Sequence, residues 1–272
     1  MILSSGSPLL VATGPLFLVG MAALSYGLAA MPMASMPKLP AMALLAGLAA
    51  HLGLLVLDIG GWGQALPGAR LGFAPVLSMT VWLVIAVHTL ESRFLPLPSV
   101  RSGLSVAGAL AVLVAAVYPG EVRPIGSPLA PLHFVLGVAS YGLFGAAVLH
   151  AILLDAAERR LRERKAAPGV LGLPLLQLER LTFRFVQAGF VVLTATLLLG
   201  VVTSSGWKWD HKTVFSLLGW AVFAALLLGR RLRGWRGKRA TRWLYAGTLL
   251  LLLGYVGSRF VFEVLLARPP SA

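Results

Sequence analysis

Long apolar stretches alternate along the chain with short segments that carry most of its charged residues. A helix needs about 20 consecutive apolar residues to cross the hydrocarbon core of a bilayer, within a range of about 17–25. Eight stretches meet or approach that length, and the fourth is short. The pattern therefore predicts membrane-spanning helices near residues 8–30, 41–59, 73–91, 103–119, 129–155, 181–204, 213–229 and 243–266.

The composition agrees with a membrane protein. Of the 272 residues, 58% are hydrophobic and 12% are charged, whereas a soluble domain usually carries about a quarter charged residues. We expect an all-α polytopic integral membrane helical bundle of about eight transmembrane helices, with residues 1–272 forming a single transmembrane domain. The chain has no cysteine, which excludes disulfides, zinc–thiolate sites and iron–sulfur clusters.

The positively charged residues set the expected orientation. Residues 155–184 and 229–242 each hold seven Lys or Arg residues, together 14 of the 23 in the chain. These two loops lie two spans apart, on one side, which should be the cytoplasm because cytoplasmic loops collect Lys and Arg. Lys38, Arg93 and Arg101 then also fall on that side. Eight spans place both termini on the extracytoplasmic side.

The net charge of +14 would indicate nucleic-acid binding in a soluble chain. Here the basic residues gather in loops between apolar stretches, so the charge reflects topology and we expect no nucleic-acid partner. The expected surroundings are a lipid bilayer. The location that fits is the bacterial cytoplasmic (inner) membrane, in a multi-pass arrangement.

The segment 206–213 holds the most distinctive chemistry of the chain. It reads Gly-Trp-Lys-Trp-Asp-His-Lys-Thr and lies between two apolar stretches. Trp207 and Trp209 can anchor a loop at a membrane surface, and a neutral imidazole from His211 can ligate iron. Together with Asp210, these residues indicate a flat, apolar, metal-containing ligand at one face of the membrane. Heme is the leading candidate.

A second histidine is expected at the same face. His133 lies in the first turn of the fifth span and His211 just before the seventh, so the predicted topology places both at the extracytoplasmic side. Two such histidines are what axial bis-imidazole ligation of heme iron requires. The alternative is that each histidine only forms hydrogen bonds at the interface.

The other histidines lie deeper or at the opposite side. His51 lies roughly 15 Å into the second span, where ionisable residues are costly and are functional candidates. It is a possible inner metal site or heme relay, or else a neutral imidazole bonded to a backbone carbonyl or to a Ser/Thr of a neighbouring helix. His150 lies about 25 Å from His133 along one helix, so it could pair only with His51. His88 is predicted to snorkel to the cytoplasmic interface.

Three charged residues near the extracytoplasmic ends complete the candidate site. Arg259 and Glu263 are four residues apart in the last span and could neutralise each other. Arg259 could instead hold a heme propionate, because arginine matches carboxylates with two parallel hydrogen bonds. Asp58, near the end of the second span, is a potential partner for Arg259 or Lys212.

Three segments of the chain resemble one known family. They are Leu132-His133-Phe134 with Ser140-Tyr141-Gly142-Leu143, then Leu178-Glu179-Arg180-Leu181 with Trp207-Lys208-Trp209-Asp210, and then Gly234-Trp235-Arg236-Gly237-Lys238-Arg239 with Gly254-Tyr255-Val256-Gly257-Ser258-Arg259-Phe260. On these residues the chain resembles the cytochrome c assembly protein family, the CcsA/CcmC-type heme-handling membrane proteins. It is most similar to the small YpjD- or HemX-like branch.

The resemblance implies a function in heme handling. It implies a heme-binding or heme-delivery protein, not itself an enzyme, that assists cytochrome c assembly and has heme and cytochrome c assembly components, or another membrane protein, as partners. The family's signature is a longer Trp/Gly segment, of which only Trp207, Trp209 and Asp210 stand here. A heme-free regulatory or scaffolding protein that stabilises a partner enzyme or transporter is therefore an alternative. A small-solute transporter fits less well because no internal repeat is visible.

The predicted topology can be tested with reporter fusions. Fusions after residues 165 and 236 should report a cytoplasmic location, because both positions lie in the basic loops. A fusion at the C-terminus should report an extracytoplasmic location. A cytoplasmic C-terminus would remove the common outer face assigned to His133 and His211.

Overall fold

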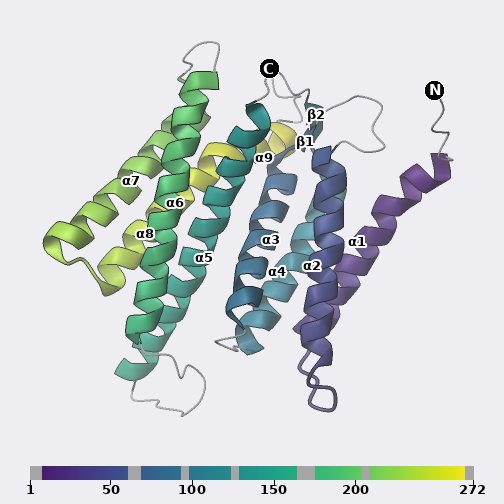
Figure 1. The fold of residues 1–272 in the computed structure, drawn as a ribbon, viewed down its shortest axis with the longest axis horizontal. Helices are drawn as coiled ribbons and strands as arrows, with labels where there is room; N and C mark the ends of the chain where they lie inside the picture. Colours follow the sequence, from purple (N-terminus) through teal and green to yellow (C-terminus); the bar gives the residue numbers. More distant parts are fainter. Residues whose placement is uncertain are drawn as a thin grey trace. The chain divides into compact units, whose positions relative to one another are not determined.

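The computed structural model describes residues 8–60, 69–92, 98–123, 129–163, 175–203 and 209–266, with only the backbone given for 8–14, 59–60, 69, 98–99 and 123. The chain divides into two compact units, Met1–Ile125 (unit 1) and Gly126–Ala272 (unit 2). Nearly all described residues are helical (Figure 1), so the all-α prediction is confirmed. Whether the two units act as one domain stays a prediction.

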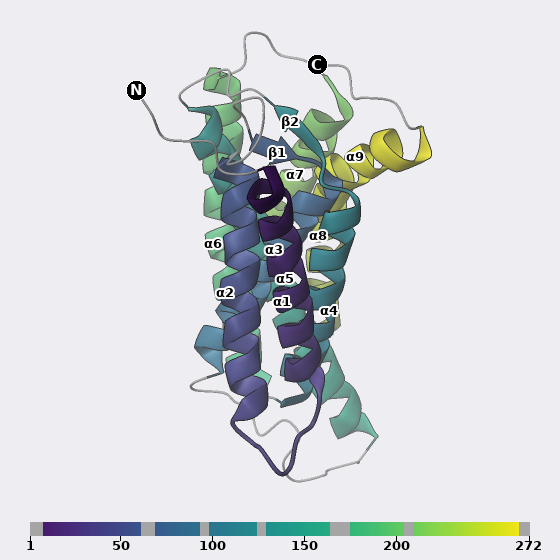
Figure 2. The ribbon, with the colours of Figure 1, turned by 90° about the vertical axis from the view of Figure 1, so that its right-hand side faces the viewer.

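Unit 1 contains four helices and two short strands. They are α1 (Pro8–Ala30), α2 (Leu39–Gly60), β1 (Ala69–Leu71), α3 (Phe73–Glu91), α4 (Pro98–Val117) and β2 (Glu121–Arg123). The strands pair antiparallel, with Arg70 opposite Val122. In Figures 1 and 2 this ribbon lies at the end of the helices where α2 stops and α3 begins. The sequence did not predict it, because strands of three residues give no readable alternation of apolar and polar positions.

Unit 2 contains four long helices, the last of which changes its winding near its end. They are α5 (Ala130–Arg162), α6 (Leu175–Thr203), α7 (His211–Arg233) and α8 (Gly237–Leu252). The chain then continues through the π-helical segment η1 (Leu253–Gly257), the single turn α9 (Ser258–Phe260) and the π-helical segment η2 (Val261–Leu265). Short π-helical segments are rare and are frequently found at functional sites.

Each predicted span corresponds to one described helix. Seven helices are long and apolar enough to cross a membrane, and in α1 the described side chains cover only the shorter apolar stretch Pro15–Ala30. Several helices extend beyond the predicted boundaries: α4 begins at Pro98 instead of 103, α6 at Leu175 instead of 181, and α5 continues to Arg162. Hydropathy marks the part of a helix inside the hydrocarbon, whereas the backbone hydrogen bonds continue into charged sequence beyond it.

The core of unit 1 is built around Tyr26, which is fully buried on α1. Glycines face its ring from two other helices: a Cβ atom would lie 2.9 Å from the ring at Gly47 on α2 and 3.0 Å at Gly108 on α4. Small residues at these positions let the helices approach closely, which is how helices associate inside a bilayer. A hydrogen bond also joins α3 to α2: the Trp82 indole N–H donates to the carbonyl of Leu48 at 2.9 Å.

The core of unit 2 follows the same rule of aromatic rings against glycines. Phe144 of α5 and Phe223 of α7 stack with ring centroids 3.9 Å apart. Gly189 of α6 faces the Phe144 ring, and Gly247 of α8 faces the Phe223 ring, where added Cβ atoms would lie at 3.0 and 2.8 Å. Stacked rings therefore fill the centre of the four-helix unit, and the glycines make room for them.

Polar contacts also join α5 to α8, far apart in the sequence. Asp155 of α5 accepts hydrogen bonds from the hydroxyls of Tyr245 at 2.9 Å and Thr241 at 3.2 Å. The hydroxyl of Tyr141 donates to the carbonyl of Leu251. Each of these buried polar groups has a partner on the neighbouring helix, which is required where no water is present.

The two ends of α7 are fixed by local sequence. Asp210 caps the start, because its carboxylate accepts hydrogen bonds from the backbone N–H and the hydroxyl of Thr213, both at 2.8 Å. Gly234 ends the helix in the left-handed conformation, with φ of 63°, and its N–H donates to the carbonyl of Arg230. Trp235 then folds back so that its ring covers Gly229.

We predict that Gly229→Ala destabilises unit 2. A Cβ atom at this position would lie 2.4 Å from the Trp235 ring, so the ring must move, and overpacking of this kind costs about 1–3 kcal/mol. Thermal unfolding of the purified protein in detergent measures the change. Gly27→Ala is the matched control, because no atom lies within 4 Å of its added Cβ. Equal melting temperatures for the two variants would contradict the packing described here.

Candidate functional site

His133 lies in the first turn of α5 and faces the last turns of α6. A Cβ atom on Gly200 would lie 3.0 Å from the His133 ring, so the glycine makes room for the imidazole. The ring is half-buried, and its Nδ1 atom is buried without a hydrogen-bond partner. A buried nitrogen in this state normally costs free energy, so it is a site at which a ligand can contribute a missing bond.

The start of α7 presents the described part of the tryptophan segment. Trp209 is exposed over 73% of its surface, and His211, the first residue of the helix, is also exposed. Partial burial alone would raise the pKa of Asp210, but its hydrogen bonds from Thr213 and the nearby Lys212 and His211 bring that pKa below its usual value. Asp210 is thus a charged cap that orients the segment. Trp207 lies outside the described residues.

Two cations surround Tyr255 in the π-helical segment η1. The Lys212 ammonium lies 5.9 Å from the centroid of the Tyr255 ring, and the Arg259 guanidinium lies 5.8 Å from it. Arg259 is only 3% exposed, and its Nε and Nη1 atoms are buried without hydrogen-bond partners. Burying an arginine with unused donors is expensive. This position suits an anionic group that supplies the missing acceptors.

These residues occupy one end of unit 2. His133 packs against the end of α6, α7 begins a few residues later, and Lys212 at its start lies against the ring of Tyr255. The Tyr141–Leu251 hydrogen bond joins α5 and α8 eight residues from His133 and eight residues from Arg259, about 12 Å along each helix. The described candidate residues that lie at this common end are His133, Trp209, Asp210, His211 and Arg259.

Arg259 does not use its Nε or Nη1 atoms to pair with Glu263. The spacing of Arg259 and Glu263 predicted mutual neutralisation, but neither Nε nor Nη1 of Arg259 donates to the Glu263 carboxylate. The helix is π-wound from Val261 to Leu265, so the direction of successive side chains differs from that of an ordinary α-helix. The second possibility raised from the sequence, that Arg259 holds a carboxylate ligand, stays a prediction.

His51 is held in a hydrogen-bonded chain within unit 1. It is 1% exposed, its Nδ1 shares a hydrogen bond of 3.2 Å with the Tyr26 hydroxyl, and its Nε2 shares one of 2.7 Å with Ser78 Oγ. These contacts match the bonded imidazole that the sequence left open, with Ser78 as the neighbouring-helix partner. Both ring nitrogens are occupied, so ligation of a metal would require one bond to break.

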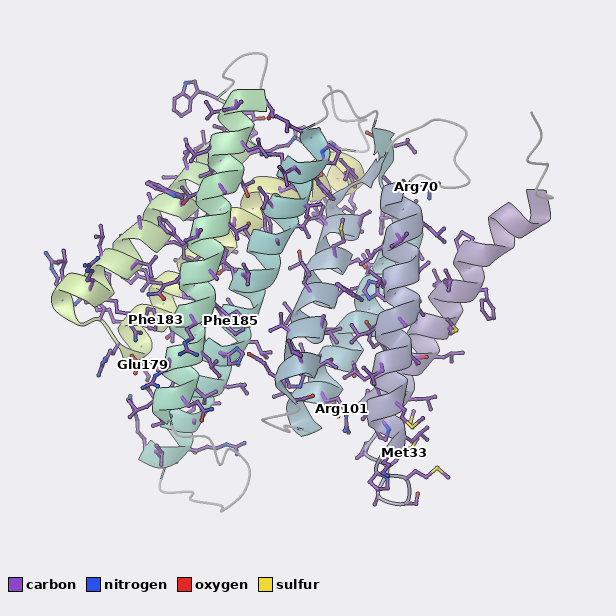
Figure 3. All side chains as sticks on the ribbon, viewed as in Figure 1. Met33, Arg70, Arg101, Glu179, Phe183 and Phe185 are labelled. Carbon is purple, nitrogen blue, oxygen red and sulfur yellow. The ribbon has the colours of Figure 1, made fainter. Side chains whose placement is uncertain are left out.

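A cavity of about 320 Å³ lies beside this chain in unit 1. His51, Ser78, Asp58 and Arg70 provide its polar lining, and apolar side chains of α1, α2 and α4, with Pro75 and Pro119, provide the rest. Asp58 had been expected to pair with Arg259 or Lys212; the charged group that faces the same cavity is Arg70 of β1. Figure 3 shows Arg70 at one end of unit 1 and Arg101 at the other.

The remaining histidines are buried in the packing. His150 donates from Nδ1 to the carbonyl of Ala146 at 2.8 Å, and its ring lies 5.3 Å from that of Phe185. Its pairing with His51 stays a prediction. His88 is only 5% exposed, so the expectation that it snorkels to the interface is wrong: it faces other helices although it lies near the end of α3.

Sequence reasoning missed three residues that shape these sites. Tyr26 and Arg70 meet His51 and Asp58 only after distant segments fold together, and no local pattern signals that contact. Tyr255 lies four residues before Arg259, a spacing that places both on one side of a helix, so its role could have been found. Within the described residues no cluster of three or more His, Asp or Glu side chains could hold a bare metal ion.

Comparisons with known proteins agree with this picture. The family model described as "Cytochrome C assembly protein" matches residues 36–266. The chain is 30% identical to the inner membrane protein YpjD of Escherichia coli over 77% of the chain and 80% of that protein. It is 26% identical to a cytochrome c biogenesis protein CcsA of Prochlorococcus marinus over 68% of the chain and 70% of that protein.

No solved structure matches the chain. The family model nevertheless covers four helices of unit 2 and most of unit 1, including His51, His133, His211 and Arg259. With seven helices able to cross a membrane in the described residues, the chain is a multi-pass membrane protein that belongs to the cytochrome c assembly protein family.

Proposed function

We propose that the protein binds heme at the extracytoplasmic end of unit 2 and delivers it for cytochrome c assembly in the cytoplasmic membrane. The observation that carries this proposal is Arg259, a nearly fully buried arginine with two unused donor nitrogens. It lies at the end of the unit that also bears His133 and His211. Family membership supports a role in heme handling. The protein would act as a carrier rather than an enzyme.

Each residue of the site then has a distinct role. His133 and His211 would hold the heme iron, because a neutral imidazole offers one nitrogen lone pair for ligation. Arg259, with Lys212 nearby, holds the propionates through charge-assisted hydrogen bonds. Trp209 provides a flat apolar surface for the macrocycle, and Trp207, from the sequence, is expected to extend it. Heme itself supplies the redox-active iron.

His51 is retained as an inner relay or second site. Its Nε2 would have to leave Ser78 Oγ before it could ligate iron. The adjoining cavity, with Asp58 and Arg70 in its lining, offers space for a ligand group next to the imidazole. We therefore infer a weaker role for His51 than for His133, whose Nδ1 needs no bond to be broken.

We predict unequal effects of the two outer histidines on heme binding. His133→Ala should abolish or drastically weaken binding, because its ring is fixed between α5 and α6. His211→Ala should leave a weakened complex with an altered spectrum, because water or another ligand could take the place of its imidazole. Heme content and the reduced-minus-oxidised spectrum of each purified variant measure these outcomes. Full heme retention by His133→Ala would refute the outer site and direct attention to His51 and His150.

We predict that Arg259 contributes affinity through its charge. Arg259→Leu should weaken heme binding, because the propionate loses its charge-assisted hydrogen bonds, whereas Arg259→Lys should restore part of the affinity. Titration of the purified variants with heme, followed at the Soret band, gives the dissociation constants. His88→Gln serves as a control for a buried substitution away from the site. Identical affinities for Arg259→Leu and the unmodified protein would exclude a propionate contact.

A heme-free scaffolding protein is the second candidate function. The shortened tryptophan segment and the fully hydrogen-bonded state of His51 favour it, because a chain without a heme platform could retain the helical units. This protein would stabilise a partner enzyme or transporter. The two functions are distinguished by co-purification: a partner that remains bound when His133 and His211 are both changed to Ala, with no Soret band after heme is supplied, supports scaffolding.

A further inference from the structure

An apolar groove separates α6 from α7 on unit 2. Figure 1 shows α7 diverging from α6 toward the lower left of the view. The space between them has a volume of about 680 Å³ and is lined by Phe190 of α6 and by Trp220, Ala224, Leu227, Leu228 and Arg231 of α7. These α7 positions share one helix face, at spacings of three and four residues.

The groove has a closed end and a charged end. At the closed end the rings of Phe190 and Trp220 stack 5.6 Å apart, and the Trp220 indole N–H donates to Thr194 Oγ1 at 2.9 Å. At the other end lie Arg230 and Arg231. Ten residues separate Trp220 from Arg230, about 15 Å along the helix, which equals half of a hydrocarbon core about 30 Å thick. The groove therefore spans one leaflet.

At the charged end, the arginines outnumber the acidic side chains that pair with them. Glu179 accepts a hydrogen bond from Arg230 at 3.4 Å and forms an ion pair with Arg236 at 3.5 Å. The Arg230 guanidinium also lies 3.4 Å from the centre of the Phe183 ring. Figure 3 shows Glu179 and Phe183 together on α6. Arg231 is exposed and has no partner among the described residues.

A further arginine adds to this excess of charge. Arg184 is exposed and lies one turn from Gln187, a residue that lines the groove. Within the described residues, the charged end thus holds Arg184, Arg230, Arg231 and Arg236, and Glu179 pairs with two of them. The arrangement holds Arg230 in place and leaves Arg184 and Arg231 available to an anion.

We propose that this groove binds one anionic phospholipid of the cytoplasmic leaflet. An acyl chain lies along Leu227, Ala224 and Trp220, and the phosphate contacts Arg231, with Arg184 beside it. Basic pockets between membrane helices on the cytoplasmic side bind anionic head groups. A lipid fits better than a partner helix, because it combines a chain of one-leaflet length with a negative charge at the end where the arginines lie. The proposal does not depend on heme binding.

The experiment compares lipids on the purified full chain in neutral detergent. Native mass spectrometry should show phosphatidylglycerol retained in preference to phosphatidylcholine of the same chain length. Each basic residue near an anionic head group is worth about 1 kcal/mol. Arg231→Gln should therefore weaken retention about fivefold, and Arg184→Gln with Arg231→Gln about thirtyfold. Arg160→Gln, which removes an exposed charge from α5, should leave retention unchanged.

Further arms separate the acyl chain from the charge. Ala224→Phe fills the groove while leaving every arginine in place, and it should also reduce retention. Soluble glycerol phosphate should compete poorly, because it has no chain for the groove. Equal retention of the two lipids, or unchanged selectivity in the double arginine variant, would overturn the proposal. So would a photo-crosslinking residue at position 224 that captures a protein chain instead of lipid in native membranes.

Discussion

Inside a bilayer, a polar side chain has no water with which to form hydrogen bonds, and this constraint governs both units of the protein. Nearly every buried polar group in the described spans meets it. Thr80, Thr182 and Thr196 donate back to carbonyls four residues earlier, and Trp82 and Tyr141 donate to carbonyls of neighbouring helices. Among the described residues, Arg101, Ser105, His133, Trp235 and Arg259 are exceptions, because each has a buried nitrogen or oxygen without a hydrogen-bond partner. Of these five, His133 and Arg259 lie at the end of unit 2 where α7 begins.

The same constraint gives the two units different capacities. In unit 1, both ring nitrogens of the buried His51 are hydrogen-bonded, one to Tyr26 and the other to Ser78. These hydrogen bonds connect α1, α2 and α3. A metal or other ligand could bind His51 only if it displaced one of these hydrogen bonds. Unit 2 satisfies Asp155 in the same way but leaves donors available near the start of α7. A protein whose buried polar groups are hydrogen-bonded in one part and lack partners in another can keep its fold while it binds and releases a ligand.

How much of this could be predicted depends on the range of the interaction. Hydropathy located all eight helices, because a span of about 20 apolar residues is a local property. Counting spans led to the expectation that His133 and His211 lie at one face, whereas the role of Asp210 as the cap of α7 came only from the structure. The Tyr26–His51–Ser78 chain, the cavity beside Arg70 and the π-winding around Arg259 could not be predicted. They depend on which faces of separate helices pack together. Glycines such as Gly47, Gly108 and Gly200 influence this packing, because each leaves room for an aromatic ring of a neighbouring helix.

The contact of Asp155 with Thr241 and Tyr245 has a consequence for biogenesis. The carboxylate belongs to the fifth helix, but its partners are synthesised about 90 residues later. When α5 leaves the ribosome and enters the membrane, the hydroxyls of Thr241 and Tyr245 have not yet been made. Its place near the basic end of α5, seven residues before Arg162, keeps it within reach of interfacial water during that interval. Insertion of α8 then supplies its two hydrogen-bond donors, so completion of the last helix is the event that fixes the register between the first and last helices of unit 2.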